Sequence, residues 1–193
     1  MFHNVRADLL MARVSRNPKL DPAEVKGSWK DLIALLQVGT LAVVSYRFAH
    51  WVRQLRLPVL RQLLAVPAGL FRHFTNLISG TWIASDAEIG PGLVVHTPYA
   101  IHIGGTRIGA NCTVQTGVVI AAGSRGIGDN VYFGAGAKVI GDAKIGNNVV
   151  IVANSLVLTD VPDNTTIVGV PARIRLPGGR PRKFPRLVAT LEK

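Results

Sequence analysis

Hydrophobic residues recur at every sixth position from residue 83 onward. With two single-residue insertions, thirteen positions of this series hold Val, Ile or Phe: Ile83, Ile89, Val95, Ile101, Ile108, Val114, Ile120, Ile127, Phe133, Val139, Ile145, Ile151 and Val157. Five of them are followed by glycine: Gly90, Gly109, Gly128, Gly134 and Gly146. Six residues form one short flat strand and a turn, and the small residue lets the backbone pass a crowded corner. Because three such sides close a coil of about 18 residues, the pattern predicts a parallel β-helix of about four to five coils.

The N-terminal region follows a different period. In residues 28–57 apolar side chains recur at spacings of three and four, which predicts a helix, and Ser28 with Asp31 resembles a capping box. A second apolar stretch, residues 57–78, contains Pro58 and Pro67. Since proline interrupts a helix, this stretch is expected to form two short helical pieces. The predicted fold class is therefore mainly β, a β-helix preceded by an α-helical region.

The apolar N-terminal region leaves three arrangements open. Residues 32–52 are long enough to span a bilayer, but they include Gln37, Arg47 and His50, which are costly in hydrocarbon. A second arrangement is an interfacial helix at the inner face of the cytoplasmic membrane, with its arginines near lipid head groups. The third is a helical domain packed on its neighbours. The arginines concerned are Arg53, Arg56, Arg61 and Arg72.

The formal charge of +11 is concentrated at the two ends of the chain. Residues 1–80 carry a net +7, residues 81–169 a net −2 and residues 170–193 a net +6. Basic flanks beside apolar ones suit an anionic membrane surface or an acidic small molecule, and no nucleic-acid-binding motif accompanies them. The single cysteine, Cys112, allows no internal disulfide, and the N-terminus lacks the pattern of a secretory signal. A cytoplasmic location is expected.

The hexads, followed by DVPDNTTIVGVPARI at residues 160–174, resemble those of the hexapeptide-repeat acyltransferases, whose fold is a left-handed β-helix. The resemblance covers about residues 80–176 and points to the serine O-acetyltransferase branch. The apolar N-terminal region resembles the related exopolysaccharide, colanic-acid-type O-acetyltransferases more closely. The expected division is a helical region (1–80), a β-helix acyltransferase domain (81–176) and a basic tail (177–193). The resemblance implies a homotrimer that uses acetyl-CoA as a co-substrate and holds no permanent cofactor.

His96 and His102 each follow an apolar repeat position, at the corner where glycine is commonest. Transfer of an acetyl group to a hydroxyl needs a base, acidic side chains are scarce in the repeat, and imidazole titrates near neutrality. His96 is therefore the predicted general base, with His102 as an alternative; the other interpretation is that both are simply exposed corner residues. Gap-free alignment with the serine enzymes places His96 on their substrate-binding Asp and Thr97 on their catalytic His, so Thr97 is a further alternative.

The same alignment assigns the substrate sites. Trp82 replaces the Asp that orients the catalytic His, and the substrate-binding loop is shortened to residues 121–126, which retain only Arg125. Trp82 and Arg125 are the predicted acceptor-binding residues. Small residues along the coils match the family's CoA-binding positions, although a tight coil also demands small residues there: Ala122, Gly134, Ala135 and Ala153. Charge alone suggests three side chains for the CoA phosphates: Lys138, Arg173 and Arg175.

The expected activity is acetyl transfer from acetyl-CoA to a saccharide hydroxyl in exopolysaccharide biosynthesis, because an aromatic residue such as Trp82 suits a sugar face. Serine O-acetylation in cysteine biosynthesis is the alternative, and a catalytically degenerate β-helix scaffold is a second one. A metal enzyme such as a γ-class carbonic anhydrase needs three converging histidines, but the repeat contains only His96 and His102. No metal site is predicted.

Overall fold

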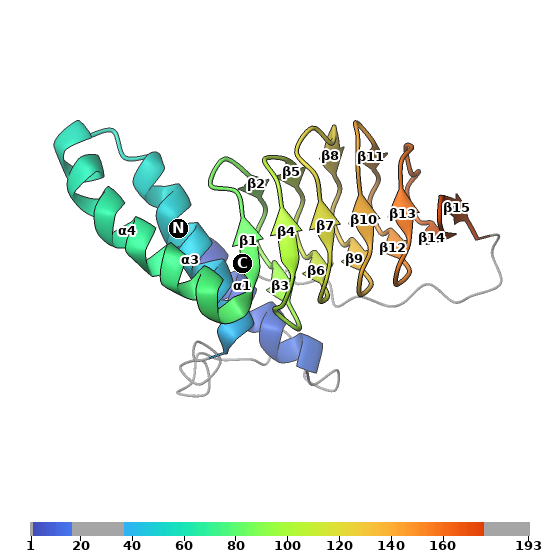
Figure 1. Cartoon of the computed structure of the whole chain (residues 1–193), viewed down its shortest axis with the longest axis horizontal. Coiled ribbons are helices and arrows are strands. Elements are labelled where there is room, and N and C mark those ends of the chain that lie inside the picture. The colour runs from blue at the N-terminus through green and yellow to red at the C-terminus, as the bar shows by residue number, and fades with distance from the viewer. Residues whose placement is uncertain (1, 17–36, 176–193) are drawn as a thin grey trace.

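A computed structural model describes residues 2–16 and 37–175 and contains three helices followed by a β-helix (Figure 1). The helices are α1 (Phe2–Arg16), α3 (Val38–Arg53) and α4 (Pro58–Ser79). The predicted capping pair Ser28 and Asp31, the first part of the predicted helix and the basic tail 177–193 lie outside the described residues. Within the described part, the predicted helix at residues 28–57 corresponds to α3.

Three parallel sheets form the walls of the β-helix. Sheet A contains β1 (Thr81–Ile83), β4 (Ile101–Ile103), β7 (Val119–Ile120), β10 (Lys138–Val139) and β13 (Leu156–Val157). Sheet B contains β2 (Glu88–Ile89), β5 (Arg107–Ile108), β8 (Gly126–Ile127) and β11 (Lys144–Ile145). Sheet C contains β3 (Val94–Val95), β6 (Thr113–Val114), β9 (Tyr132–Phe133), β12 (Val150–Ile151), β14 (Thr166–Gly169) and β15 (Ala172–Ile174), of which β15 pairs antiparallel with β14. The predicted left-handed parallel β-helix is confirmed.

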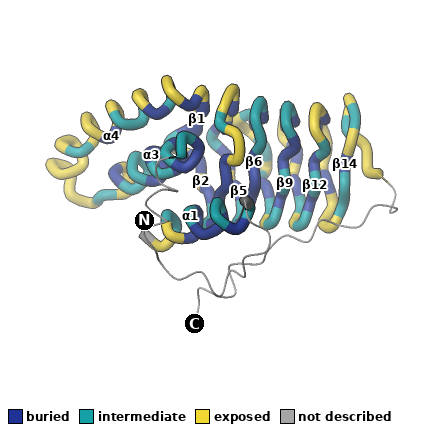
Figure 2. The backbone as a smooth tube through the Cα atoms, turned by 90° about the horizontal axis from the view of Figure 1, so that it is seen from below, coloured by how far each residue is buried: buried dark blue, intermediate teal, exposed yellow. Residues whose placement is uncertain are grey.

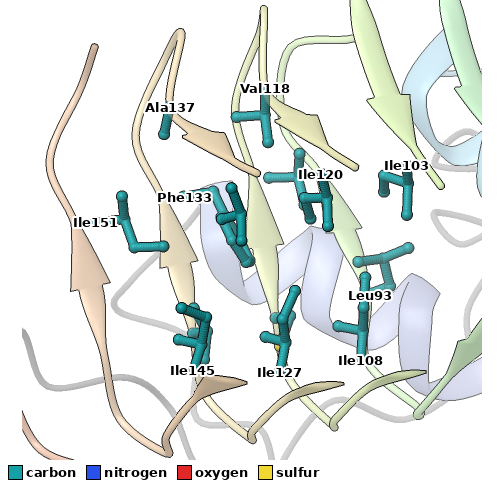
Figure 3. Close-up of a cluster of buried hydrophobic side chains, with 14 of the residues drawn as sticks. Leu93, Ile103, Ile108, Val118, Ile120, Ile127, Phe133, Ala137, Ile145 and Ile151 are labelled. Carbon is teal, nitrogen blue, oxygen red and sulfur yellow. The ribbon is translucent and has the colours of Figure 1, made fainter. Parts of the chain in front are cut away.

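The interior of the β-helix is filled by the hydrophobic repeat. All thirteen repeat residues are buried in one core cluster, and the neighbouring coils stack Ile on Ile along sheet B (Figure 3). The predicted register is wrong at one position. Ile83 pairs with Ile103, which continues to Ile120, so Ile103 and not Ile101 continues this stack in sheet A. Ile101 pairs with Thr81 instead, because the preceding corner holds extra residues.

The corner between sheets B and C is held by a ladder of polar side chains. Asp129 accepts a hydrogen bond from the amide of Ala110 at 2.7 Å, Asn147 accepts from the amide of Asp129 at 2.8 Å, and Asp163 accepts from the amide of Asn147 at 2.8 Å. The glycine before each step is required by space, since a Cβ at Gly128 would lie 2.7 Å from the carbonyl carbon of Gly146. The glycines of the repeat therefore allow successive coils to stack at this corner.

Helix α3 closes the N-terminal end of the β-helix. Its side chains Val43 and Tyr46 belong to the same core cluster as the inward residues of the first coil. The Tyr46 hydroxyl donates a 2.6 Å hydrogen bond to the carbonyl of Ala87. Burial raises the pKa of Tyr46 to about 12, so the phenol stays protonated and remains a donor. The apolar interior of the first coil is thus covered by protein instead of water.

A buried ion pair joins α1, α3 and the first coil. Arg47 and Asp8 are 5% and 2% exposed, and the Arg47 Nε lies 3.0 Å from a carboxylate oxygen of Asp8. Arg47 also donates to the carbonyls of Ile89 and Gly90, while Asp8 accepts from the amides of Gly92 and Leu93, each at 2.8 Å. Burial raises the pKa of Asp8, and Arg47 and the two amides act in the opposite direction.

Helix α4 is one continuous helix, so the prediction of two short pieces is wrong. Pro58 occupies the first turn, where a missing N–H breaks no helical bond. Pro67 lies inside the helix and leaves the carbonyl of Leu63 without its usual donor. Both residues are exposed, so water can satisfy that carbonyl. Packing of the opposite face, through Ala68, Thr75 and Ser79, maintains the helix across the proline.

The outer face of α4 is apolar and exposed (Figure 2). We call this face the α4 stripe; its exposed large apolar residues are Val59, Leu60, Leu63, Val66, Leu70, Phe74, Leu77 and Ile78. Within residues 2–16 and 37–175, no helix combines the length and hydropathy needed to cross a bilayer.

The buried ion pair predicts a large effect of removing one partner. Arg47→Met should lower the free energy of unfolding by about 3–5 kcal/mol, because it leaves a buried carboxylate without its counter-charge. The double variant Asp8→Asn with Arg47→Met should recover part of this loss, since the carboxamide oxygen still accepts from Gly92 and Leu93. Urea unfolding measures both. A loss of less than about 1 kcal/mol for Arg47→Met would contradict the assigned role.

Candidate active site

Five of the predicted site residues lie at one corner of the β-helix. His96 and Thr97 follow β3, Gly134 and Ala135 follow β9, and Ala153 follows β12; in each case the chain turns there from sheet C to sheet A. This edge, which we call the C–A corner, therefore carries the predicted base on the first coil and three predicted CoA-binding residues on the third and fourth coils. The roles of these residues remain predictions.

The C–A corner is enlarged at His96. The stacked positions Val95 and Ile103 are eight residues apart, whereas Val114 and Ile120 on the next coil are six apart. The enlarged turn ends at Ala100, whose φ of 52° is in the left-handed region that residues with a Cβ avoid. On later coils the equivalent place is taken by glycine or asparagine, as at Gly117 and Asn154. The first coil thus has a distinct, strained turn where a histidine is exposed.

The imidazole of His96 has one local partner. Its Nδ1 lies 3.5 Å from the Thr97 hydroxyl, at the limit of a hydrogen bond. This contact leaves Nε2 available to a substrate. Among the residues that the structure describes, no carboxylate contacts the ring.

A narrow pocket opens beside His96. It lies between α1, the first turn of α3 and β3, and it is lined by Asp8, Ala12, Gln37, Thr40, Val43, Leu93, Val94, Val95 and His96. Sequence reasoning missed Gln37 and Thr40, because their position next to His96 depends on how α3 packs on the first coil. Gly39 is the one residue of this helix turn whose type reflects the close packing of α3 on β3. A Cβ at this position would lie 2.4 Å from the carbonyl oxygen of Val95.

Trp82 and His102 lie on the outer face of sheet A. They are paired in register on β1 and β4, and their rings stack with centroids 4.4 Å apart and an interplanar angle of 16°. His96, by contrast, follows a strand of sheet C. The stack gives His102 a structural partner, and it covers one face of the Trp82 indole.

The remaining predicted residues lie at the corner between sheets A and B. Ala122 and Arg125 follow β7, in the turn toward β8. Arg125 donates to the carbonyl of Asp142 at 2.7 Å and forms an ion pair with Asp160. The amide of Lys144 and the Arg125 guanidinium hold the pKa of Asp160 below its usual value. Within one chain, therefore, Arg125 and His96 lie on different edges of the β-helix.

The side chains suggested for the CoA phosphates lie on different strands. Lys138 is exposed on β10, Arg173 is on β15, and Arg175 follows that strand.

Cys112 is fully buried, which raises the pKa of its thiol to about 12 and makes it a poor nucleophile. Among the described residues, no group of three or more His, Cys, Asp or Glu side chains is placed to hold a metal ion.

Comparison with known proteins identifies similar sequences and folds. Residues 126–159 match the family model described as bacterial transferase hexapeptide (six repeats). Over 150 residues, or 74% of the chain, the sequence is 38% identical to a serine acetyltransferase of Synechococcus elongatus and 39% identical to one of Staphylococcus epidermidis. The matched region spans 59% and 67% of these relatives' lengths. The soybean serine acetyltransferase complexed with serine superposes with a TM-score of 0.69 at 31% identity, covering 89% of this chain and 68% of the soybean one.

These similarities confirm the resemblance to hexapeptide-repeat acyltransferases and to their serine O-acetyltransferase branch. The expectation of an exopolysaccharide-type enzyme acting on a saccharide hydroxyl is wrong, because the matching relatives are serine acetyltransferases. The indole of Trp82, proposed as a sugar platform, is stacked on His102 and lies on sheet A, whereas His96 lies at the C–A corner.

Proposed function

Because the chain belongs to the serine acetyltransferase family, we propose that it transfers the acetyl group of acetyl-CoA to the hydroxyl of serine. One observation carries the proposal: the C–A corner places an exposed histidine on the first coil and small residues on the coils that follow. A base and a narrow track for an extended thioester are what such a transfer needs. The matched region covers only part of the relatives' lengths. The activity is therefore argued from residues that this chain contains.

His96 acts as the general base. Its Nε2 accepts the proton of the serine hydroxyl while the hydroxyl oxygen attacks the thioester carbonyl. The resulting tetrahedral intermediate collapses with cleavage of the carbon–sulfur bond, and the imidazolium returns the proton to the departing thiolate. Thr97 keeps the ring oriented through its contact with Nδ1.

The donor lies along the C–A corner. Gly134, Ala135 and Ala153 have small side chains, so the pantetheine arm can approach their backbone groups. With coils about 4.8 Å apart, these residues lie roughly 10–15 Å along the axis from His96. That separation lets the arm extend from the acyl group toward the later coils. Lys138, Arg173 and Arg175 are the cations available for the phosphates, and no permanently bound cofactor takes part.

Replacing His96 tests the chemistry. His96→Ala should lower kcat for O-acetylserine formation about 100-fold or more at a nearly unchanged KM for acetyl-CoA, because a base acts in the transition state and not in donor binding. Steady-state assays with L-serine and acetyl-CoA measure both constants. The matched control is His102→Ala, which removes a histidine stacked on Trp82 and should leave kcat within about threefold.

Two results would contradict this assignment. If His102→Ala or Thr97→Ala is damaging and His96→Ala is silent, the base is elsewhere. If the unmodified protein binds CoA but forms no O-acetylserine, the chain is a degenerate scaffold and the proposed activity is wrong.

We further propose that the active protein is a homotrimer. The predicted site residues divide between two edges of one β-helix, with His96 at the C–A corner and Ala122 and Arg125 at the corner between sheets A and B. A cyclic arrangement brings the second edge of one copy against the first edge of the next. Each copy then supplies half of a site, and CoA lies between neighbouring chains.

The proposed trimer predicts the molecular mass in solution and the recovery of activity when two inactive variants are mixed. Light scattering should give three times the chain mass of 20.7 kDa. His96→Ala and Arg125→Ala should each impair activity, and random mixing of the two after denaturation should restore about a quarter of the sites, those with both intact halves. A stable monomer with full activity, or no recovery on mixing, would contradict the shared site.

The α4 stripe is proposed to contact an anionic membrane surface. From Val38 to Ser85 the chain contains no Asp or Glu, while Arg53, Arg56, Arg61 and Arg72 are all present. An apolar face flanked by cations is complementary to anionic lipid. Two copies meeting through this face would bring like charges together, which disfavours self-association.

Vesicle sedimentation tests this surface. The protein should sediment with vesicles that contain phosphatidylserine, less with phosphatidylcholine alone, and should be partly released by high salt. Leu63→Gln with Leu70→Gln should reduce sedimentation, whereas Ile140→Gln, an exposed apolar residue of the β-helix, should not. If the double variant changes the oligomeric mass and leaves vesicle binding unaltered, the α4 stripe is a protein interface instead.

A further inference from the structure

Gln115 lies next to His96 at the C–A corner, one coil further along the β-helix. Val95 pairs with Val114 in sheet C, so the residues that directly follow them, His96 and Gln115, occupy the same corner position on neighbouring coils. The amide of His96 donates to the carbonyl of Val114 at 3.0 Å, which fixes this register. The two residues are therefore separated by one coil spacing, about 4.8 Å.

The same corner position on the third coil carries no side chain. Val114 pairs with Phe133, and the residue that follows Phe133 is Gly134. A Cβ at Gly134 would lie 2.5 Å from the amide nitrogen of Ala153, so only glycine fits there. Gln115 thus lies between the proposed base and the proposed track of the pantetheine arm. The thioester carbonyl has to occupy this interval.

The backbone on both sides of Gln115 is held in place. Its own amide donates to the carbonyl of Phe133 at 3.2 Å. The Thr116 hydroxyl and the Gly117 amide both donate to the carbonyl of Tyr99, at 3.0 and 2.9 Å, in the enlarged turn of the first coil. These bonds fix Gln115 relative to the turn that carries the proposed base.

The carboxamide of Gln115, by contrast, is unused. Among residues 2–16 and 37–175 it makes no hydrogen bond, and the residue is half-buried. A carboxamide carries two N–H donors. A partly desolvated donor on a fixed backbone is suited to an acceptor that a substrate supplies.

The backbone amides of this corner series are already used. In acyl transfer, the negative charge that develops on the carbonyl oxygen is met by backbone amides or by polar side chains such as a carboxamide. Four amides of the series donate instead to the next coil, at 2.8–3.2 Å: those of His96, Gln115, Gly134 and Val152. The donor that remains in the series is the side chain of Gln115.

We propose that Gln115 is the oxyanion donor of the acetyl transfer, an inference that rests on the proposed function. As the serine oxygen attacks the thioester, the carbonyl electron pair moves onto the carbonyl oxygen and His96 takes the hydroxyl proton. A carboxamide N–H of Gln115 donates to that oxygen in the tetrahedral intermediate. When the carbonyl re-forms, the carbon–sulfur bond breaks and the departing thiolate takes the proton from His96.

Gln115→Met tests the proposal, because it removes both donors and nearly keeps the length of the side chain. The kcat for O-acetylserine formation should fall about 100-fold, as for loss of one oxyanion donor, while the KM for acetyl-CoA stays within about threefold. Gln115→Glu should be at least as damaging at neutral pH, because a carboxylate has no donor and repels the developing charge. The melting temperature of both variants should be unchanged, since the carboxamide makes no bond in the described part of the protein.

Gln62→Met and Gln62→Glu are the matched controls. Gln62 is exposed on α4, outside the C–A corner. Both variants should leave kcat and KM within about twofold of the unmodified protein. A fall in kcat of less than about tenfold for Gln115→Met, or an effect on the KM for acetyl-CoA alone, would overturn the assignment while the acetyl-transfer function stands.

Hydrolysis of acetyl-CoA separates this proposal from the function on which it rests. The same oxyanion forms when water replaces serine, and the release of free CoA can be measured without an acceptor. If the unmodified protein acetylates no serine but releases CoA, and Gln115→Met slows that release about 100-fold, the donor is retained and the proposed acceptor is wrong. If the unmodified protein cleaves acetyl-CoA with neither serine nor water, Gln115 has no oxyanion to stabilise and both proposals fail.

Discussion

The contact between Arg47 and Asp8 determines how the helical region meets the β-helix. Both charges are buried, so each needs the other, and together they also satisfy backbone groups of the first coil at Ile89, Gly90, Gly92 and Leu93. An apolar contact of the same area would tolerate small shifts, whereas this set of directed bonds accepts only one placement of α3. The position of the α3 N-terminus beside His96 follows from that placement.

The interior of the fold could be predicted from the sequence because the same packing requirement recurs on every coil. Each coil needs an inward apolar residue on every side, and all thirteen positions of the series are indeed buried. The one register error, Ile101 for Ile103, occurred at the enlarged corner, where a repeat of fixed length no longer applies. Pro67 was misjudged for a different reason: tertiary packing on one face and water on the other preserve a helix that local propensity would interrupt.

The site was less predictable than the core. The corner position of His96 and the repeat positions of Gly134, Ala135 and Ala153 were predictable from the sequence, and the roles of these residues stay predictions. The position of Gln37 and Thr40 beside His96 could not be predicted, because no local pattern links residues 37–40 to residues 93–96; only the packing of α3 on β3 does. The acceptor was assigned wrongly from Trp82, since the composition of a strand does not reveal that its neighbour's ring will stack on it.

The α3 cap has a consequence for the behaviour of the chain in solution. A β-helix ends in unpaired strand edges at both ends, and an uncovered coil can accept a coil of another molecule and grow into a fibre. At the N-terminal end, Val43 and Tyr46 of α3 cover the first coil; at the other end, β15 runs antiparallel to β14 and stops the parallel stacking of sheet C. The elements that complete the hydrophobic core therefore also protect the protein against end-to-end polymerisation.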